Sequence, residues 1–412
     1  MLKKYINSIN EYPGTFWTLV GALFIDRMGG ALIFPFLALY LTSKFSIGMT
    51  EVGTLFAIIS LCSFFGSLLG GALTDRFGRR KLMMFGLIAS AASTLVIGLT
   101  NDLRVIYIVA IFVGLLSDVG HPATQAMVAD ILPESKRLGG FGILRVVANL
   151  AVTIGPAVGG IIAAKSFVWL FIIDAIASTL TALIVLFILP ETKPKAIEGE
   201  KTPSVYQTFK GYGVVLKDSL FMIFLGVTAI STLVYMQMNS TLSVYLRDFH
   251  NIDTRHFGYI LSLNALMVVV FQFWVTRKIA KYRPMLLMTI GTFFYAIGFA
   301  AYGFVSTHVL FLAAMVIITI GEMIVSPTSS ALVTRLAPAE MRGRYMAVTG
   351  FSWIIPSMIG PLAAGLVMDN LNPNWVWYAG GILGLIATAG YFVLSKISSN
   401  RLSGTPISEE NQ

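Results

Sequence analysis

The chain has 412 residues, of which 56% are hydrophobic and only 12% are charged, and this composition excludes a soluble globular protein. The net charge of +9 comes from lysines and arginines in short loops between apolar runs. That placement indicates a membrane surface, and not nucleic acid, as the partner. The single cysteine, Cys62, excludes an intrachain disulfide and a metal cluster built from thiolates, and we expect no cofactor.

Apolar runs dominate the chain from residue 15 onwards. A membrane helix needs about 20 consecutive apolar residues, and the sequence supplies runs of that length twelve times. The polar stretch 1–12 precedes the first run and does not predict a signal peptide. In chain order, the predicted spans are 15–42, 49–74, 82–100, 104–131, 139–164, 167–190, 219–246, 255–276, 284–305, 308–335, 343–368 and 375–396.

Positive charge is distributed unequally between the two sides of these spans. If residue 1 is cytosolic, 22 lysines and arginines fall on the cytosolic side and five on the opposite side, while Arg27 and Arg145 lie within spans. Positive residues concentrate in cytosolic loops. We therefore expect a multi-pass protein of the cell (plasma) membrane with both termini in the cytosol.

The polar, lysine-rich stretch 191–217 divides the chain near its middle and predicts a linker. A shift of 205 residues brings the two parts into register without gaps, and carries Pro122 onto Pro327 and Gly155-Pro156 onto Gly360-Pro361. Chance similarity between apolar helices would not keep prolines and glycines in step, so the shift indicates an internal repeat. The predicted organisation is a six-helix bundle at 1–190, a cytosolic linker at 191–217, a second six-helix bundle at 218–400 and a cytosolic tail at 401–412.

The loop between the second and third spans reads Gly71-Ala-Leu-Thr-Asp75-Arg76-Phe-Gly78-Arg79-Arg80, and its glycines permit a sharp turn. The pattern G-x-L-x-D-R-x-G-R-R at this place resembles the signature loop of the major facilitator superfamily, most closely of its drug:proton antiporter branch. The resemblance implies an all-α membrane protein with 12 transmembrane helices, in two pseudo-symmetric six-helix halves around a central cavity. It also implies a charge lock between helices made by Asp75, Arg79 and Asp130. In the repeat Asp75 maps onto Ala280, so we expect an asymmetric gate. The predicted gate residues are Gly71, Asp75, Arg76, Gly78, Arg79, Arg80 and Asp130.

A few ionisable side chains lie at membrane depth, where each costs about 2.5–3.5 kcal/mol on insertion scales and is a functional candidate by default. In the resembled family, the first, fourth, seventh and tenth helices line the central cavity, and these are the spans that carry most of them. We expect Glu322 and Asp118 to carry the proton, with Asp26 next, and we interpret Asp174 of the sixth span as structural. The predicted proton-coupling and substrate-cavity residues are Asp26, Arg27, Asp118, His121, Gln237, Asn239 and Glu322.

The fifth span carries a run of small residues, Gly155-Pro156-Ala-Val-Gly159-Gly160. It resembles the G-P-x-x-G-G motif of antiporters in the same superfamily, and small residues of this kind permit a close helix crossing. One departure concerns the arginine that the family usually carries in the fourth helix, which is Ala110 here. Arg27 and Arg145 are the candidates to replace it. The predicted packing residues are Arg145, Gly155, Pro156, Gly159 and Gly160.

Together these patterns predict a secondary active transporter that works by alternating access. The resemblance favours a proton-coupled exporter of amphipathic or drug-like small molecules. The alternative is a proton-coupled symporter or facilitator of a defined metabolite, such as a sugar, peptide or organic anion, with Arg27 as anion anchor. No filter loop of the kind found in ion channels occurs, so we expect no channel. No nucleotide-binding or zinc-protease motif occurs either, so we expect no enzyme. The expected partners are a small-molecule substrate, protons and the lipid bilayer, and we expect a monomer that binds no nucleic acid.

Overall fold

The computed structural model describes residues 11–117, 119–193, 213–338 and 341–397. Within these ranges every regular element is a helix. Twelve stretches of helix are long and apolar enough to cross a membrane, which confirms the predicted all-α membrane fold with twelve spans. Residues 194–212 of the predicted linker and the predicted tail, 401–412, lie outside the described residues.

The chain forms two compact units, which are described separately. The first consists of Met1–Ala196 and Asn239–Ala265, and the second of Ile197–Met238 and Leu266–Gln412. The change of unit near residue 196 falls in the predicted linker, whereas the assignment of 239–265 to the first unit differs from a simple division in sequence. The limits predicted for the domains stay a prediction.

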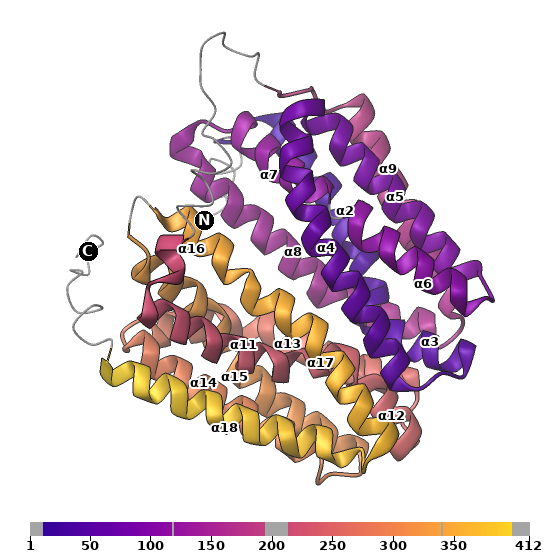
Figure 1. Cartoon of the computed structure of the whole chain (residues 1–412), viewed down its shortest axis with the longest axis vertical. Helices are drawn as coiled ribbons and strands as arrows, with labels where there is room; N and C mark the ends of the chain where they lie inside the picture. Colours follow the sequence, from indigo (N-terminus) through magenta and orange to yellow (C-terminus); the bar gives the residue numbers. More distant parts are fainter. Residues whose placement is uncertain (1–10, 118, 194–212, 339–340, 398–412) are drawn as a thin grey trace. The chain divides into compact units, whose positions relative to one another are not determined.

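The first unit contains the indigo to magenta helices of Figure 1. The helix α2 packs against α8 and α9, and α5 packs against α9. A buried cluster at one end of the unit includes Phe16 of α2, Met83 of α5 and Val128 of α7. The elements are α2 (Gly14–Ile33), η1 (Phe34–Phe36), α3 (Leu37–Phe45), α4 (Met49–Phe77), α5 (Arg79–Leu99), α6 (Leu103–Phe112), η2 (Val113–Ser117), α7 (Gly120–Ile131), α8 (Glu134–Ala163), α9 (Phe167–Phe187), α12 (Leu242–His250) and the first part of α13 (Thr254–Ile279).

In the second unit α14 packs against both α15 and α18. Its core is aromatic and aliphatic, with Phe221 and Phe224 of α11, Met288 of α14 and Tyr391 of α18 fully buried. Large apolar side chains on the outside, such as Phe273 at 72% exposure, suit a lipid-facing surface and not water. The elements are α11 (Ser219–Ser240), the rest of α13, α14 (Pro284–Tyr302), α15 (His308–Leu336), α16 (Arg342–Thr349), α17 (Phe351–Asn370) and α18 (Asn374–Ile397).

The helix boundaries repeat at the offset found in the sequence. Both ends of α3 and α12 lie 205 residues apart, as do the ends of the fourth span, 103–131, and of α15, 308–336. Each of the short helices α3 and α12 is followed by a residue with left-handed backbone, Ser46 (φ 52°) and Asn251 (φ 54°). Non-glycine residues rarely adopt this conformation, so the matched pair is independent support for the internal repeat.

Four spans are interrupted where the sequence predicts continuous helices, and one of them is the eleventh, which is divided at Gly350 between α16 and α17. A 3₁₀ turn at Phe34–Phe36 breaks the first span, because Pro35 lacks the N–H that continues a helix. The seventh is split between α11 and α12 at Thr241. The fourth contains a π-helical turn, η2, where a side chain on Gly114 would lie 2.5 Å from the Ile59 carbonyl of α4. Its repeat partner α15 runs through Pro327 unbroken, so the two halves differ in shape here.

Candidate functional site

The turn between α4 and α5 carries the predicted gate. Gly78 ends α4 with φ 96°, a conformation that favours glycine. The next residue, Arg79, begins α5 and is buried, and its Nε lies 2.9 Å from Oδ2 of Asp130 at the end of α7. The structure thus brings together Arg79 and Asp130 of the predicted lock. Asp75 lies in the last turn of α4, and its side chain is outside what the structure describes.

The first two residues of the predicted linker, Glu191 and Thr192, complete this turn. Glu191 accepts the Arg79 backbone N–H at 2.8 Å, and a side chain on Gly78 would lie 2.5 Å from its Oε2. Thr192 donates its hydroxyl to the same Asp130 oxygen as Arg79, at 3.0 Å. The anionic Glu191 therefore sits at the N-terminus of α5, where the helix dipole favours negative charge. In the sequence, the signal for this contact is an acidic residue followed by a hydroxyl residue, Glu191-Thr192, directly after Pro190 at the end of the predicted sixth span.

The other predicted gate residues surround this cluster. Arg80 donates to the Leu186 carbonyl of α9 at 2.5 Å, and the Arg76 carbonyl accepts the Lys193 ammonium at 2.8 Å. Both contacts tie α4 and α5 to the chain that leaves α9. Gly71 lies within α4, and a side chain there would meet nothing within 4 Å, so no close packing requires that glycine.

Two neighbouring residues of α2 point in different directions. Arg27 is exposed, and its Nη2 lies 3.4 Å from Nδ1 of His121 on α7. Gln125, one turn further along α7, contacts the other ring nitrogen of His121 at 3.5 Å. Asp26 instead faces α9, where Ser178 donates its hydroxyl to Oδ1 at 2.9 Å. The predicted set of Asp26, Arg27 and His121 is therefore divided between two faces of one helix turn.

Asp26 has an acidic neighbour, Asp174 of α9, which is 5% exposed and close enough for the two charges to repel. Gly29 of α2 lies against this carboxyl, and a side chain there would come within 2.5 Å of Oδ1. Asp174 was interpreted as structural because the sixth helix is peripheral in the resembled fold. No pattern in the sequence links Asp174 to Asp26, since α2 and α9 meet only on folding.

The second unit carries a separate acidic group. Glu322 of α15 accepts the Tyr235 hydroxyl of α11 at 2.9 Å, and the Tyr235 ring packs against Tyr295 at a centroid distance of 5.6 Å. Gln237 is buried, donates to the Leu233 carbonyl of its own helix at 3.1 Å, and lies against Gly360 of α17. Asn239, at which the chain passes into the first unit, is half-buried in the last turn of α11. Asp118 lies outside the described residues.

The small residues of α8 lie where the motif predicts close packing. A side chain on Gly155 would meet Ala31 of α2 at 2.5 Å, and one on Gly159 would meet the Leu32 carbonyl at 2.6 Å. A side chain on Gly160 would lie 2.9 Å from the Cα of Gly258 of α13. Pro156 is buried within α8, which continues through it as one helix. Arg145 is exposed and lies more than two turns away from these glycines.

Among the residues that the structure describes, no three His, Cys, Asp or Glu side chains converge as a metal site would require. The predicted proton-coupling groups that the structure describes, together with Asp174, are thus arranged in three places. These are the Arg27–His121 face, the Asp26–Asp174 pair behind it, and the Glu322–Tyr235 pair of the second unit.

Comparisons with known proteins agree with this architecture. The family described as Major Facilitator Superfamily matches residues 19–356. A Na(+), Li(+), K(+)/H(+) antiporter of Planococcus maritimus is 27% identical over 406 residues, covering 91% of this chain and 93% of that protein. The class H tetracycline resistance protein of Pasteurella multocida is 25% identical, covering 93% and 97%. A solved POT family transporter, in complex with 5-aminolevulinic acid, shares the fold with a TM-score of 0.77 at 16% identity, covering 95% and 97%.

Proposed function

The chain belongs to the Major Facilitator Superfamily, and from this premise we propose that it exports amphipathic or drug-like small molecules in exchange for protons, by alternating access. Relatives that support this assignment include a cation/H(+) antiporter, a tetracycline resistance protein and a multidrug resistance protein. Each is 24–27% identical to this chain. The substrate and the coupling are therefore argued from the side chains of this protein.

One observation carries the proposal: a single turn of α2 holds an exposed cation, Arg27, and a carboxyl, Asp26, that faces the buried Asp174. Two carboxylates close together in a desolvated site repel each other, and a proton bound to either removes both the repulsion and part of the desolvation cost. We assign the transported proton to the Asp26–Asp174 pair. Ser178 donates its hydroxyl to Asp26 at 2.9 Å and holds that carboxyl in place.

The exposed face of the same turn is the proposed substrate contact. Arg27, His121 and Gln125 offer donors and a flat ring at one place on the first unit. A change in the charge of Asp26 acts directly on its neighbour Arg27, because opposite charges on adjacent residues attract. Proton binding behind α2 and substrate binding in front of it are thereby linked. In this scheme the ion pair between Arg79 and Asp130 breaks and re-forms as the protein alternates between its two access states.

Transport into proteoliposomes under an imposed pH gradient tests this assignment. Asp26→Asn and Asp174→Asn should each abolish accumulation against a gradient while leaving downhill exchange of the same substrate. The matched control is Asp369→Asn, because Asp369 is exposed at the end of α17. If both variants still accumulate substrate at the wild-type level, the assignment to Asp26 and Asp174 is wrong, and Glu322 or Asp118 becomes the candidate proton carrier.

A second function has an observation of its own. Arg27 and His121 together form a basic face, which suits a carboxylate-bearing metabolite and its uptake with a proton. Screening cationic dyes against organic anions and short peptides in the same proteoliposomes separates the two. Uptake of an anion that Arg27→Gln abolishes, with no dye transport, would favour this alternative.

We also propose that the protein acts as a monomer in the cell membrane. Both termini lie in the cytosol in this proposal, and the uneven distribution of lysine and arginine supports that orientation. Epitope tags at each end, probed in intact and permeabilised cells, test the orientation. A tag that an antibody reaches in intact cells would show that this terminus lies outside the cell.

A further inference from the structure

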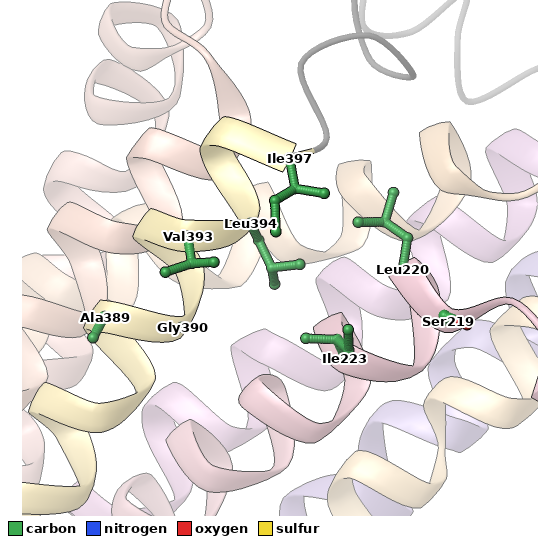
Figure 2. Close-up of a pocket in the computed structure, with 8 residues that line it drawn as sticks. All are labelled: Ser219, Leu220, Ile223, Ala389, Gly390, Val393, Leu394 and Ile397. Atoms are coloured by element: carbon green, nitrogen blue, oxygen red, sulfur yellow. The ribbon is translucent and has the colours of Figure 1, made fainter.

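A groove opens on the second unit between the start of α11 and the end of α18, with a volume of about 540 Å³. Seven of its eight lining residues are apolar or glycine. Figure 2 shows Leu220 and Ile223 on α11 opposite Leu394 and Ile397 on α18, with Ser219 at the edge. The groove belongs to two membrane spans.

The sequence creates this groove by placing small residues beside a tight crossing. The two helices are held together at Tyr391, whose hydroxyl lies 2.8 Å from that of Thr228, and at Gly390, where a side chain would lie 2.7 Å from Val227. From this crossing towards the start of α11 and the end of α18, side chains line the groove without filling it. Ile223, Val393 and Ile397 are 54%, 53% and 64% exposed.

Two lysines lie close in the chain to residues that line the groove. Lys217 precedes Ser219 by two residues, and Lys396 is in the last turn of α18, beside Ile397; both are exposed. The nearby carboxylate of Asp218 is turned to other partners, since it accepts the Tyr345 hydroxyl at 2.7 Å and the Phe221 backbone N–H at 3.2 Å. The groove is thus apolar along its length, and two exposed lysines lie next to its lining residues in the chain. The ammonium of Lys396 lies 4.6 Å from the centroid of the Phe392 ring, one turn earlier in α18.

We propose that this groove binds an anionic phospholipid, with an acyl chain in the apolar part and the headgroup phosphate at Lys217 and Lys396. An empty apolar space forfeits the dispersion contacts of its lining, and a flexible hydrocarbon chain restores them. Any membrane lipid could supply that chain. The lysines select the headgroup, because each basic residue at a membrane surface strengthens the attraction to anionic lipid. This site is distinct from the ionisable residues assigned to transport.

Native mass spectrometry of the purified full-length protein, titrated with phosphatidylglycerol or phosphatidylcholine, tests the proposal. Lys217→Gln and Lys396→Gln should each weaken phosphatidylglycerol binding about five-fold, and the double variant about 25-fold. Phosphatidylcholine binding should stay unchanged in all three. The matched control is Lys278→Gln with Lys281→Gln, two exposed lysines of the same unit, which should leave this site unaffected.

A variant that fills the groove separates the lipid from other occupants. Ala389 is exposed in the groove wall, so Ala389→Trp should occupy the space without disturbing the core. It should lower the binding of both lipids and leave the oligomeric state unchanged. Equal phosphatidylglycerol affinity in the wild type and the double lysine variant would overturn the proposal. So would a dimer in the wild type that Ala389→Trp dissociates, since the groove would then hold a second copy of the chain.

Discussion

Gly29 and Gly30 are adjacent in α2 and offer a matched test of the contact between α2 and α9. A methyl group on Gly29 would lie 2.5 Å from Oδ1 of Asp174, and 3.1 Å from both the Cα of Asp174 and the Cβ of Ala177. The last two atoms belong to the helix framework, so a rotation of the Asp174 side chain alone cannot relieve the crowding. On Gly30, the same methyl group would meet nothing within 4 Å.

The expected free energies have opposite signs. Overpacking of a well-packed site costs about 1–3 kcal/mol, whereas replacing glycine by alanine within a helix contributes about 0.5–1 kcal/mol of stability. Gly29→Ala should therefore destabilise the protein by roughly 0.5–2 kcal/mol after this offset. Gly30→Ala should stabilise it by about 0.5–1 kcal/mol.

Thermal unfolding of both variants, followed by tryptophan fluorescence in the same detergent, measures this difference. We expect the melting temperature of Gly29→Ala to fall below that of the wild type and the melting temperature of Gly30→Ala to rise above it. If Asp174 takes part in proton coupling, Gly29→Ala should also lose uphill transport more than Gly30→Ala. Equal shifts of the melting temperature in both variants would refute the close packing of α2 against Asp174.

Three further predictions concern the gate, the second unit and a helix end. Arg79→Ala should reduce transport far more than Lys281→Ala on the pseudo-equivalent loop, because Arg79 pairs with a carboxylate at 2.9 Å. Equal transport rates of the two variants in proteoliposomes would show that both residues act only as positive charges at the membrane surface. Tyr235→Phe removes the hydrogen bond to Glu322 and should alter the pH dependence of transport without preventing assembly, which a pH series on purified protein checks. Asp253 caps α13, and the backbone N–H of His256 holds the pKa of its carboxyl below the usual range. Asp253→Ala should therefore cost about 1 kcal/mol in the first turn of α13. This contribution is present above the unfolded pKa of about 3.9 and is lost as the pH falls through the lower folded value. Amide hydrogen exchange in that turn at pH 7 and at lower pH should show the difference shrink; a difference independent of pH would contradict the capping role.

The sequence by itself determined the twelve spans and the repeat. Both depend on local properties, namely the length of apolar runs and the positions of glycine and proline, and the helices that follow from them begin and end 205 residues apart in both halves. The contact between Arg79 and Asp130 also followed from the sequence, through the resemblance of the loop that contains Arg79. The close crossing at Gly155 was predicted from the G-P-x-x-G-G motif, because small residues let neighbouring helices approach closely.

Tertiary structure decided which ionisable groups meet. A helical residue presents its side chain at an angle that the sequence gives only relative to its own helix, and the partner across the contact depends on how the helices pack. For that reason Asp26 and Arg27, adjacent in the chain, face different neighbours, and Asp26 lies with Asp174, which is 148 residues away. Glu191 likewise reaches the turn at Gly78 because α9 packs against α5. Burial of charge in a membrane is costly unless the group is paired, so the packing that creates these pairs also fixes where protons and ions can bind.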